Sequence, residues 1–130
     1  MSQSAHLALM RRTLDAFGTG HMATLSEVFA PDIVWRVPGR STLAGTYAGQ
    51  AEVFGFFGKM MELTAGTFRV EPVGMMANDS GGVFIDRLKA EREGRALDVE
   101  LCLVVRIANG KIIEGTDYIH HEHQWDAFWE

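Results

Sequence analysis

Two aspartates stand at positions where the sequence otherwise predicts buried strand residues. Along residues 83–92 the side chains alternate between two faces, and Asp86 falls on the face that carries apolar neighbours. Along residues 111–120, Asp117 also shares a face with apolar residues, and Gly115 leaves space beside its carboxyl group. Because burying a carboxylate without partners costs several kcal/mol, roughly, two inward carboxyls indicate a functional site.

A pair of carboxyl groups in a dry site can act as an acid and a base. The two charges repel, so one pKa rises while the other stays low. We therefore expect Asp117 to be a general base, with Asp86 as the partner acid or as an orienting group. The alternative is structural: both carboxyls satisfy internal hydrogen bonds. A one-residue slip of either strand would also turn its aspartate outward.

The elements that must hold these aspartates follow from the apolar spacing. A first helix is expected to begin at Ser4 and to end at Gly18, where Leu7, Met10 and Leu14 form one stripe. Asn109-Gly110 predicts a tight hairpin between the last two strands. The further helices are expected at 22–30 and 50–63, the strands at 33–37, 68–76, 83–92, 98–108 and 111–120, and a helical turn at 124–129. Helices grouped before an antiparallel sheet predict an α+β fold.

Four stretches carry a resemblance to a known family. They are residues 29–35 (FAPDIVW), 45–49 (GTYAG), 110–114 (GKIIE) leading to Asp117-Tyr118, and 125–129 (WDAFW). Together they resemble the SnoaL-like branch of the nuclear-transport-factor-type and ketosteroid-isomerase-like proteins. The resemblance implies one domain over residues 1–130, a cystatin-like roll. Its cone-shaped, curved antiparallel sheet would pack against three N-terminal helices and enclose an apolar pocket. It also implies a homodimer formed through the outer face of the sheet.

The resemblance narrows the chemistry. Epoxide hydrolases of this family place aspartates where Asp86 and Asp117 stand, but Phe84 occupies the position of their bridging arginine. Their water-holding asparagine has no counterpart in residues 31–48, and Val37 stands where ketosteroid isomerases have their base. Polyketide cyclases of this branch use an inward aspartate as a base toward a carbon acid, which is a role that Asp117 could fill.

Five aromatic or flexible side chains are expected to bind the ligand. They are Trp35, Tyr47, Phe57, Met61 and Phe84. Trp35 is inward on the first strand, where a core role is equally compatible with its position. Tyr47 could donate a phenolic hydrogen bond to a ligand or cover a loop. Trp125, Phe128 and Trp129 are expected to seal the wide end of the cone or to join a dimer contact.

Several function classes are disfavoured by composition. The formal net charge is -5 and no dense Lys/Arg cluster occurs, so nucleic-acid binding is not expected. The lone Cys102 excludes an internal disulfide and a multi-thiolate zinc site. His120, His121 and His123 lack chelating spacing and His21 opens a helix, so no metal and no cofactor are expected. We also expect no signal peptide and no membrane span, hence a cytoplasmic location.

Three functions remain open. The favoured one is a small-molecule enzyme of isomerase, cyclase or hydrolase type, acting on an apolar substrate by carboxylate acid/base catalysis. The alternatives are a non-catalytic protein that binds a small hydrophobic ligand, and a dimeric scaffold. The enzyme hypothesis requires both carboxyls at one cavity. The scaffold hypothesis predicts an interior filled with side chains.

Overall fold

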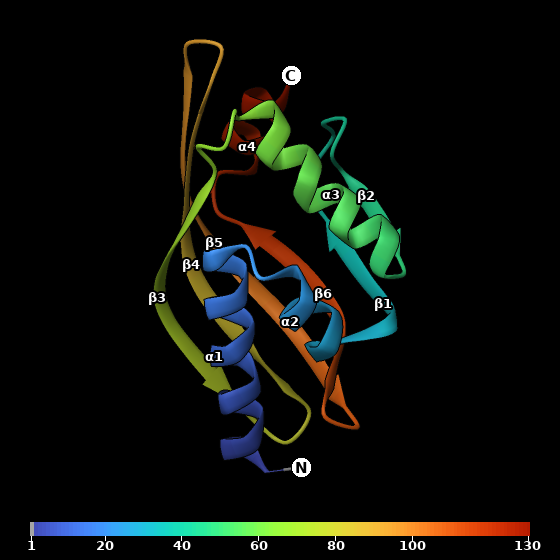
Figure 1. Cartoon of the computed structure of the whole chain (residues 1–130). Coiled ribbons are helices and arrows are strands. Elements are labelled where there is room, and N and C mark those ends of the chain that lie inside the picture. The colour runs from blue at the N-terminus through green and yellow to red at the C-terminus, as the bar shows by residue number, and fades with distance from the viewer. Residues whose placement is uncertain (1) are drawn as a thin grey trace.

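The computed structural model describes residues 2–130, which form a six-stranded sheet and four helices (Figure 1). The helices are α1 (Gln3–Thr19), α2 (Met22–Val28), α3 (Gln50–Leu63) and α4 (Glu122–Trp129). The strands are β1 (Phe29–Val37), β2 (Gly45–Ala48), β3 (Arg69–Ala77), β4 (Gly81–Arg92), β5 (Arg95–Ala108) and β6 (Lys111–Ile119). The predicted α+β class is confirmed.

The strands are arranged in the order β2-β1-β6-β5-β4-β3. The sheet is mixed, which corrects the expected antiparallel sheet, because β1 and β6 are parallel neighbours. The other neighbours are antiparallel, and β3 to β6 form the expected meander. The sheet is curved, and α1, α2 and α3 lie over one side of it, with α1 against β3 and β4 and α3 against β1 and β2 (Figure 1). The interior between helices and sheet holds the core.

The first helix is longer at both ends than predicted. Ser2 rather than Ser4 is the N-cap, and its hydroxyl oxygen accepts a hydrogen bond from the backbone N–H of Ala5 at 3.2 Å. The helix runs past Gly18 and ends at Gly20, which has a φ of 71°. A left-handed residue is what a helix C-cap requires, and Gly20 supplies it without steric penalty.

The alternation of buried and exposed residues is as predicted in β4 and β5, but β6 contains a bulge. Ile107 pairs with Ile112, whereas the adjacent Arg106 pairs with Glu114. Ile113 is therefore the extra residue, and Ile112 is fully buried although simple alternation with Gly115 and Asp117 would bury Ile113. The expected hairpin before the bulge is present, with positive φ at both turn residues, 53° and 75°.

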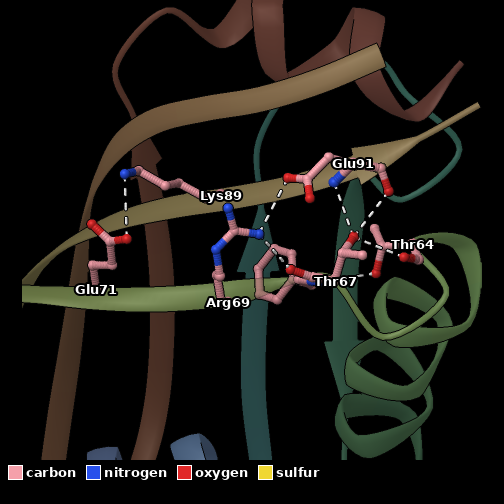
Figure 2. A network of polar contacts seen from close by, with 7 residues as sticks. Thr64, Thr67, Arg69, Glu71, Lys89 and Glu91 are labelled. Carbon is pink, nitrogen blue, oxygen red and sulfur yellow. Dashed lines mark hydrogen bonds and ion pairs between the residues drawn. The ribbon is translucent and has the colours of Figure 1, made fainter. Parts of the chain in front are cut away.

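The junction between α3 and β3 is fixed by a polar network (Figure 2). The Thr67 hydroxyl accepts a hydrogen bond from the Glu91 N–H at 2.9 Å and donates to the Thr64 carbonyl oxygen at 2.7 Å. Arg69 Nη1 donates to the Glu91 carboxylate at 3.2 Å. The Thr64 hydroxyl accepts from the N–H of Phe68 at 3.2 Å. These bonds fix Phe68, whose buried ring faces the interior.

The C-terminal helix is a full helix rather than the single turn predicted, and hydrogen bonds hold its middle and its last turn. The Asp126 carboxylate accepts hydrogen bonds from the backbone N–H groups of Arg40 at 3.0 Å and Ser41 at 3.2 Å. Arg92 and Arg95 donate to carbonyl oxygens in the last turn of α4 at 3.1 and 2.8 Å. Because unpaired C-terminal carbonyls need donors, these arginines complete the helix.

Two large side chains stand exposed on β5 and β6, Val104 at 37% and Tyr118 at 60%. They are compatible with a contact through the outer face of the sheet, and the homodimer stays a prediction. Among residues 2–130, no helix is long and apolar enough to span a membrane.

Candidate functional site

A cavity of about 80 Å³ lies between the helices and the sheet. Its walls are mostly apolar. The walls include Phe57 and Met60 from α3, and Phe84 and Leu88 from β4. Its polar lining within the described chain consists of Thr13, Asp86, Asp117 and the indole groups of Trp35 and Trp125. Both predicted catalytic carboxyls therefore reach one cavity.

The strand register explains why both aspartates point inward. Asp117 on β6 pairs with Leu103 on β5, and Leu103 pairs with Phe84 on β4. Asp86 lies two residues after Phe84, so alternation turns it to the same side. Asp86 is 4% exposed, while Asp117 is half-buried. One strand separates the two aspartates, and they share one face of the sheet.

Trp35 holds the Asp117 carboxyl. Its indole Nε1 donates a hydrogen bond to Asp117 Oδ2 at 3.2 Å. The ring can lie there because a Cβ at Gly115 would stand 2.6 Å from the Trp35 ring, closer than any side chain permits. The space that Gly115 was expected to leave beside the carboxyl is thus occupied by this indole.

The Asp86 carboxyl has a different environment. Its Oδ1 is buried and has no hydrogen-bond partner among residues 2–130. No lysine, arginine or histidine of the described chain lines the cavity. Burying a carboxylate that lacks both a cation and a full set of donors is unfavourable. No contact of the described chain offsets this free energy at Asp86 Oδ1.

Both carboxyls have raised pKa values. Burial raises the pKa of Asp86 from its ordinary 3.8 to about 6. Burial also raises the pKa of Asp117 to about 7, where the Trp35 hydrogen bond lowers it and the charge of Asp86 raises it. A group with a pKa near neutrality can accept and release a proton with little penalty. Asp117 is the stronger base of the two.

Replacing Trp35 by phenylalanine is expected to raise the pKa of Asp117 further. Trp35→Phe keeps an aromatic ring against Gly115 and removes the N–H that stabilises the carboxylate. Carbon-13 NMR titration of the aspartate carboxyl resonances measures the shift. Tyr47→Phe is the matched control, since the Tyr47 hydroxyl donates to the Leu43 carbonyl oxygen at 2.7 Å. An unchanged Asp117 titration in Trp35→Phe contradicts this prediction.

The five predicted ligand-binding residues divide into two groups. Trp35, Phe57 and Phe84 line the cavity. Tyr47 stacks on Phe56 with ring centroids 4.8 Å apart and is not part of the lining. Met61 is 42% exposed on α3 and also lies outside the lining.

The position of Trp125 in the cavity lining differs from the position that the sequence predicts. Trp125 was expected to seal the end of the cone or join a dimer contact, yet it is 1% exposed and reaches the cavity. The i, i+4 spacing with Trp129 was the available signal, because it places both indoles on one face of a helix.

Across residues 2–130, no group of three or more His, Cys, Asp or Glu side chains could hold a metal ion.

Comparison with known proteins places the chain in a family. The model of the SnoaL-like domain matches residues 10–115. The chain belongs to the SnoaL-like family. The uncharacterized protein Rv0034 of Mycobacterium tuberculosis is 34% identical over 130 residues, which cover 99% of both chains.

Solved structures agree with this assignment. Bal32a, from a soil-derived mobile gene cassette, is 36% identical with a TM-score of 0.95, covering 98% of each chain. A protein of unknown function with a cystatin-like fold from Xanthomonas campestris is 31% identical, with a TM-score of 0.90, covering 95% of this chain and 97% of that one. The SnoaL-like chain therefore has the cystatin-like fold that its sequence predicts.

Proposed function

We propose that this SnoaL-like chain is a small-molecule enzyme of isomerase, cyclase or hydrolase type, acting on a neutral apolar substrate. Asp117 is its general base. Asp86 is the neighbouring charge that strengthens this base. Within that range, the site fits best the removal of a proton from a carbon next to a carbonyl group.

The observation that carries the proposal is the pair of carboxyls that line one cavity, where no basic side chain of the described chain accompanies them. Asp117 accepts one hydrogen bond, from Trp35, and one buried oxygen of Asp86 has no partner among residues 2–130. Buried polar side-chain atoms normally have at least one hydrogen-bond partner, so the unpaired oxygen of Asp86 is unusual. Perturbed pKa values cluster at functional sites because catalysis needs bases that titrate near the working pH.

The proton balance is simple. The Asp117 carboxylate takes the proton from the α-carbon, and the C–H electron pair forms a carbon–carbon double bond while the carbonyl π electrons move to oxygen. Return of the proton from Asp117 to another carbon gives an isomer. Attack of the enolate carbon on a second carbonyl of the substrate closes a ring: the π electrons of that carbonyl move to its oxygen, which takes the proton from Asp117. A protein of Jannaschia sp. CCS1 that has been assigned to the SnoaL-like polyketide cyclases shares the fold, with a TM-score of 0.80 at 15% identity. Its assignment is compatible with this chemistry.

The cavity lining also limits the substrate. Two carboxyls and no basic side chain disfavour an anionic ligand, because an added negative charge would meet repulsion in a low-dielectric site. The small volume favours compounds with few heavy atoms, or larger ones that move a flexible lining residue such as Met60.

Hydrogen–deuterium exchange tests the proposal directly. The protein is incubated in D₂O with cyclopentanone and, separately, with cyclohexanone, and proton NMR follows the α-hydrogens. We expect exchange well above the rate in buffer alone. A non-catalytic binding protein would bind the ketones without accelerating exchange, and that result contradicts the proposal in favour of the binding alternative.

A further inference from the structure

The Trp125 indole N–H is the unused hydrogen-bond donor of the cavity. The Thr13 hydroxyl already donates to the Leu9 carbonyl oxygen at 2.8 Å, and the Trp35 N–H donates to Asp117. Trp125 Nε1 is buried and has no partner among residues 2–130. Leaving a buried donor unpaired is unfavourable, and Trp125, unlike the equally unpaired Trp129, lines the cavity, where a ligand can supply the missing acceptor.

The other polar groups of the lining define that partner. The carboxyls of Asp86 and Asp117 are acceptors when ionised, and no basic side chain of the described chain joins them. A ligand that suits the whole set must carry no negative charge, must present one acceptor oxygen to an N–H, and must offer hydrogen to a carboxylate. A small ketone with an α-hydrogen meets all three conditions.

We infer that Trp125 binds the substrate's oxygen: its indole N–H donates to the carbonyl of a small neutral ketone while Asp117 takes the α-proton. This assignment rests on the proposed function and adds the group that receives the oxygen. As the α-proton moves to Asp117, negative charge develops on that oxygen. A donor that is fixed beside the oxygen stabilises this charge without reorganisation.

The fold holds Trp125 in place for this task. Its neighbour Asp126 is bound to the backbone of the loop at residues 40 and 41, and Arg92 and Arg95 hold the last turn of the same helix. The Trp125 ring also meets the Trp129 ring edge to face, with centroids 5.3 Å apart. The donor is therefore built on a helix that is anchored at its middle and at its last turn, as a preorganised site requires.

The indole resonances of the protein provide the test. The chain has three tryptophans, so a nitrogen-15 spectrum contains three indole N–H signals, which single Trp→Phe variants assign. The probes are cyclopentanone and methylenecyclopentane, which have nearly the same shape and differ in the acceptor oxygen. These small rings suit the cavity of this protein, which is smaller than the cavity of about 150 Å³ that accommodates benzene.

We expect cyclopentanone to move the Trp125 indole proton downfield and methylenecyclopentane to leave it nearly unchanged. In Trp125→Phe the Kd for cyclopentanone should rise about three- to tenfold, the range that one hydrogen bond gives. The Kd for methylenecyclopentane should stay the same. Trp129→Phe is the matched control, because Trp129 Nε1 is also buried and unpaired among residues 2–130 but does not line the cavity.

Two failures are distinguishable. If cyclopentanone binds and exchanges its α-hydrogens, but the Trp125 signal responds equally to both probes, the assignment of Trp125 is wrong and the proposed function stands. If neither probe binds and no exchange occurs, the proposed function fails together with the assignment. Should Trp125→Phe not fold, the wild-type spectrum alone decides between these outcomes.

Discussion

Asp117→Asn is expected to lower the rate of α-hydrogen exchange by about 10²- to 10⁴-fold, the usual contribution of a positioned general base. The asparagine keeps the size of the side chain, and its oxygen can still accept the hydrogen bond from Trp35 Nε1. It lacks only the ability to take a proton. Because the cavity and its apolar walls are unchanged, ketone affinity should stay close to that of the wild type. The measurement is proton NMR of the ketone in D₂O, at equal ligand saturation.

The pH profile separates the role of Asp117 from that of Asp86. In the wild type, kcat/KM should rise with pH and level off above about 7, as the Asp117 carboxyl loses its proton. In Asp86→Asn the neighbouring charge that raises the pKa of Asp117 is gone, so the inflection should move to lower pH. Asp117→Asn should show no such inflection. An Asp117→Asn protein that exchanges ketone hydrogens at the wild-type rate would show that the base lies elsewhere.

The positions of the two aspartates could be predicted from the sequence because β4 and β5 are regular over the stretch that matters. Twelve consecutive residues of β4 pair with β5 without a shift, so a period of two assigns Asp86 to the inner face. The face on which Asp117 lies is harder to predict, because the bulge at Ile113 lies in the same strand. The bulge adds one residue between Ile112 and Glu114, and the alternation from Gly115 to Asp117 is regular again. The inward face of Asp117 follows from the residues after the bulge.

Most features that the sequence does not predict depend on contacts between distant segments, and one, at Tyr47, is local. The parallel pairing of β1 with β6 joins residues about eighty positions apart, and no local pattern specifies it. The Tyr47 hydroxyl is bound to a carbonyl of its own loop, which no periodicity reports. Trp125 reaches the cavity because Asp126 and two arginines of the β4–β5 hairpin seat the last helix. That the Trp125 N–H has no partner depends on the three-dimensional hydrogen bonding of the cavity lining, which the sequence does not specify.

The two aspartates should also make the folded protein less stable at neutral pH than in mild acid. Each folded-state pKa, about 6 for Asp86 and about 7 for Asp117, lies above the ordinary 3.8 of an unfolded chain. Between about pH 4 and pH 7 the folded state therefore binds more protons than the unfolded state. The stability is fully present below the unfolded pKa, and the free energy of unfolding falls as the pH rises through this window. Above it, the contribution of these groups is constant.

Replacing either aspartate with the neutral asparagine should remove its share of this loss in the free energy of unfolding. At pH 8 we expect Asp86→Asn and Asp117→Asn each to raise the free energy of unfolding by on the order of 2 kcal/mol, since each unit of pKa shift corresponds to about 1.4 kcal/mol and partial solvation reduces the effect. Below pH 4 both variants should match the wild type or be slightly less stable. Urea denaturation followed by circular dichroism at several pH values measures the difference. Asp32→Asn, at an exposed position of β1, is the matched control for the loss of a carboxyl group outside the cavity, and it should change the free energy of unfolding little. Variants that are less stable than the wild type at pH 8 would mean that the carboxylates support the fold. Asp117→Asn, which slows exchange, should thus also stabilise the protein, which is the pattern of a residue retained for its chemistry.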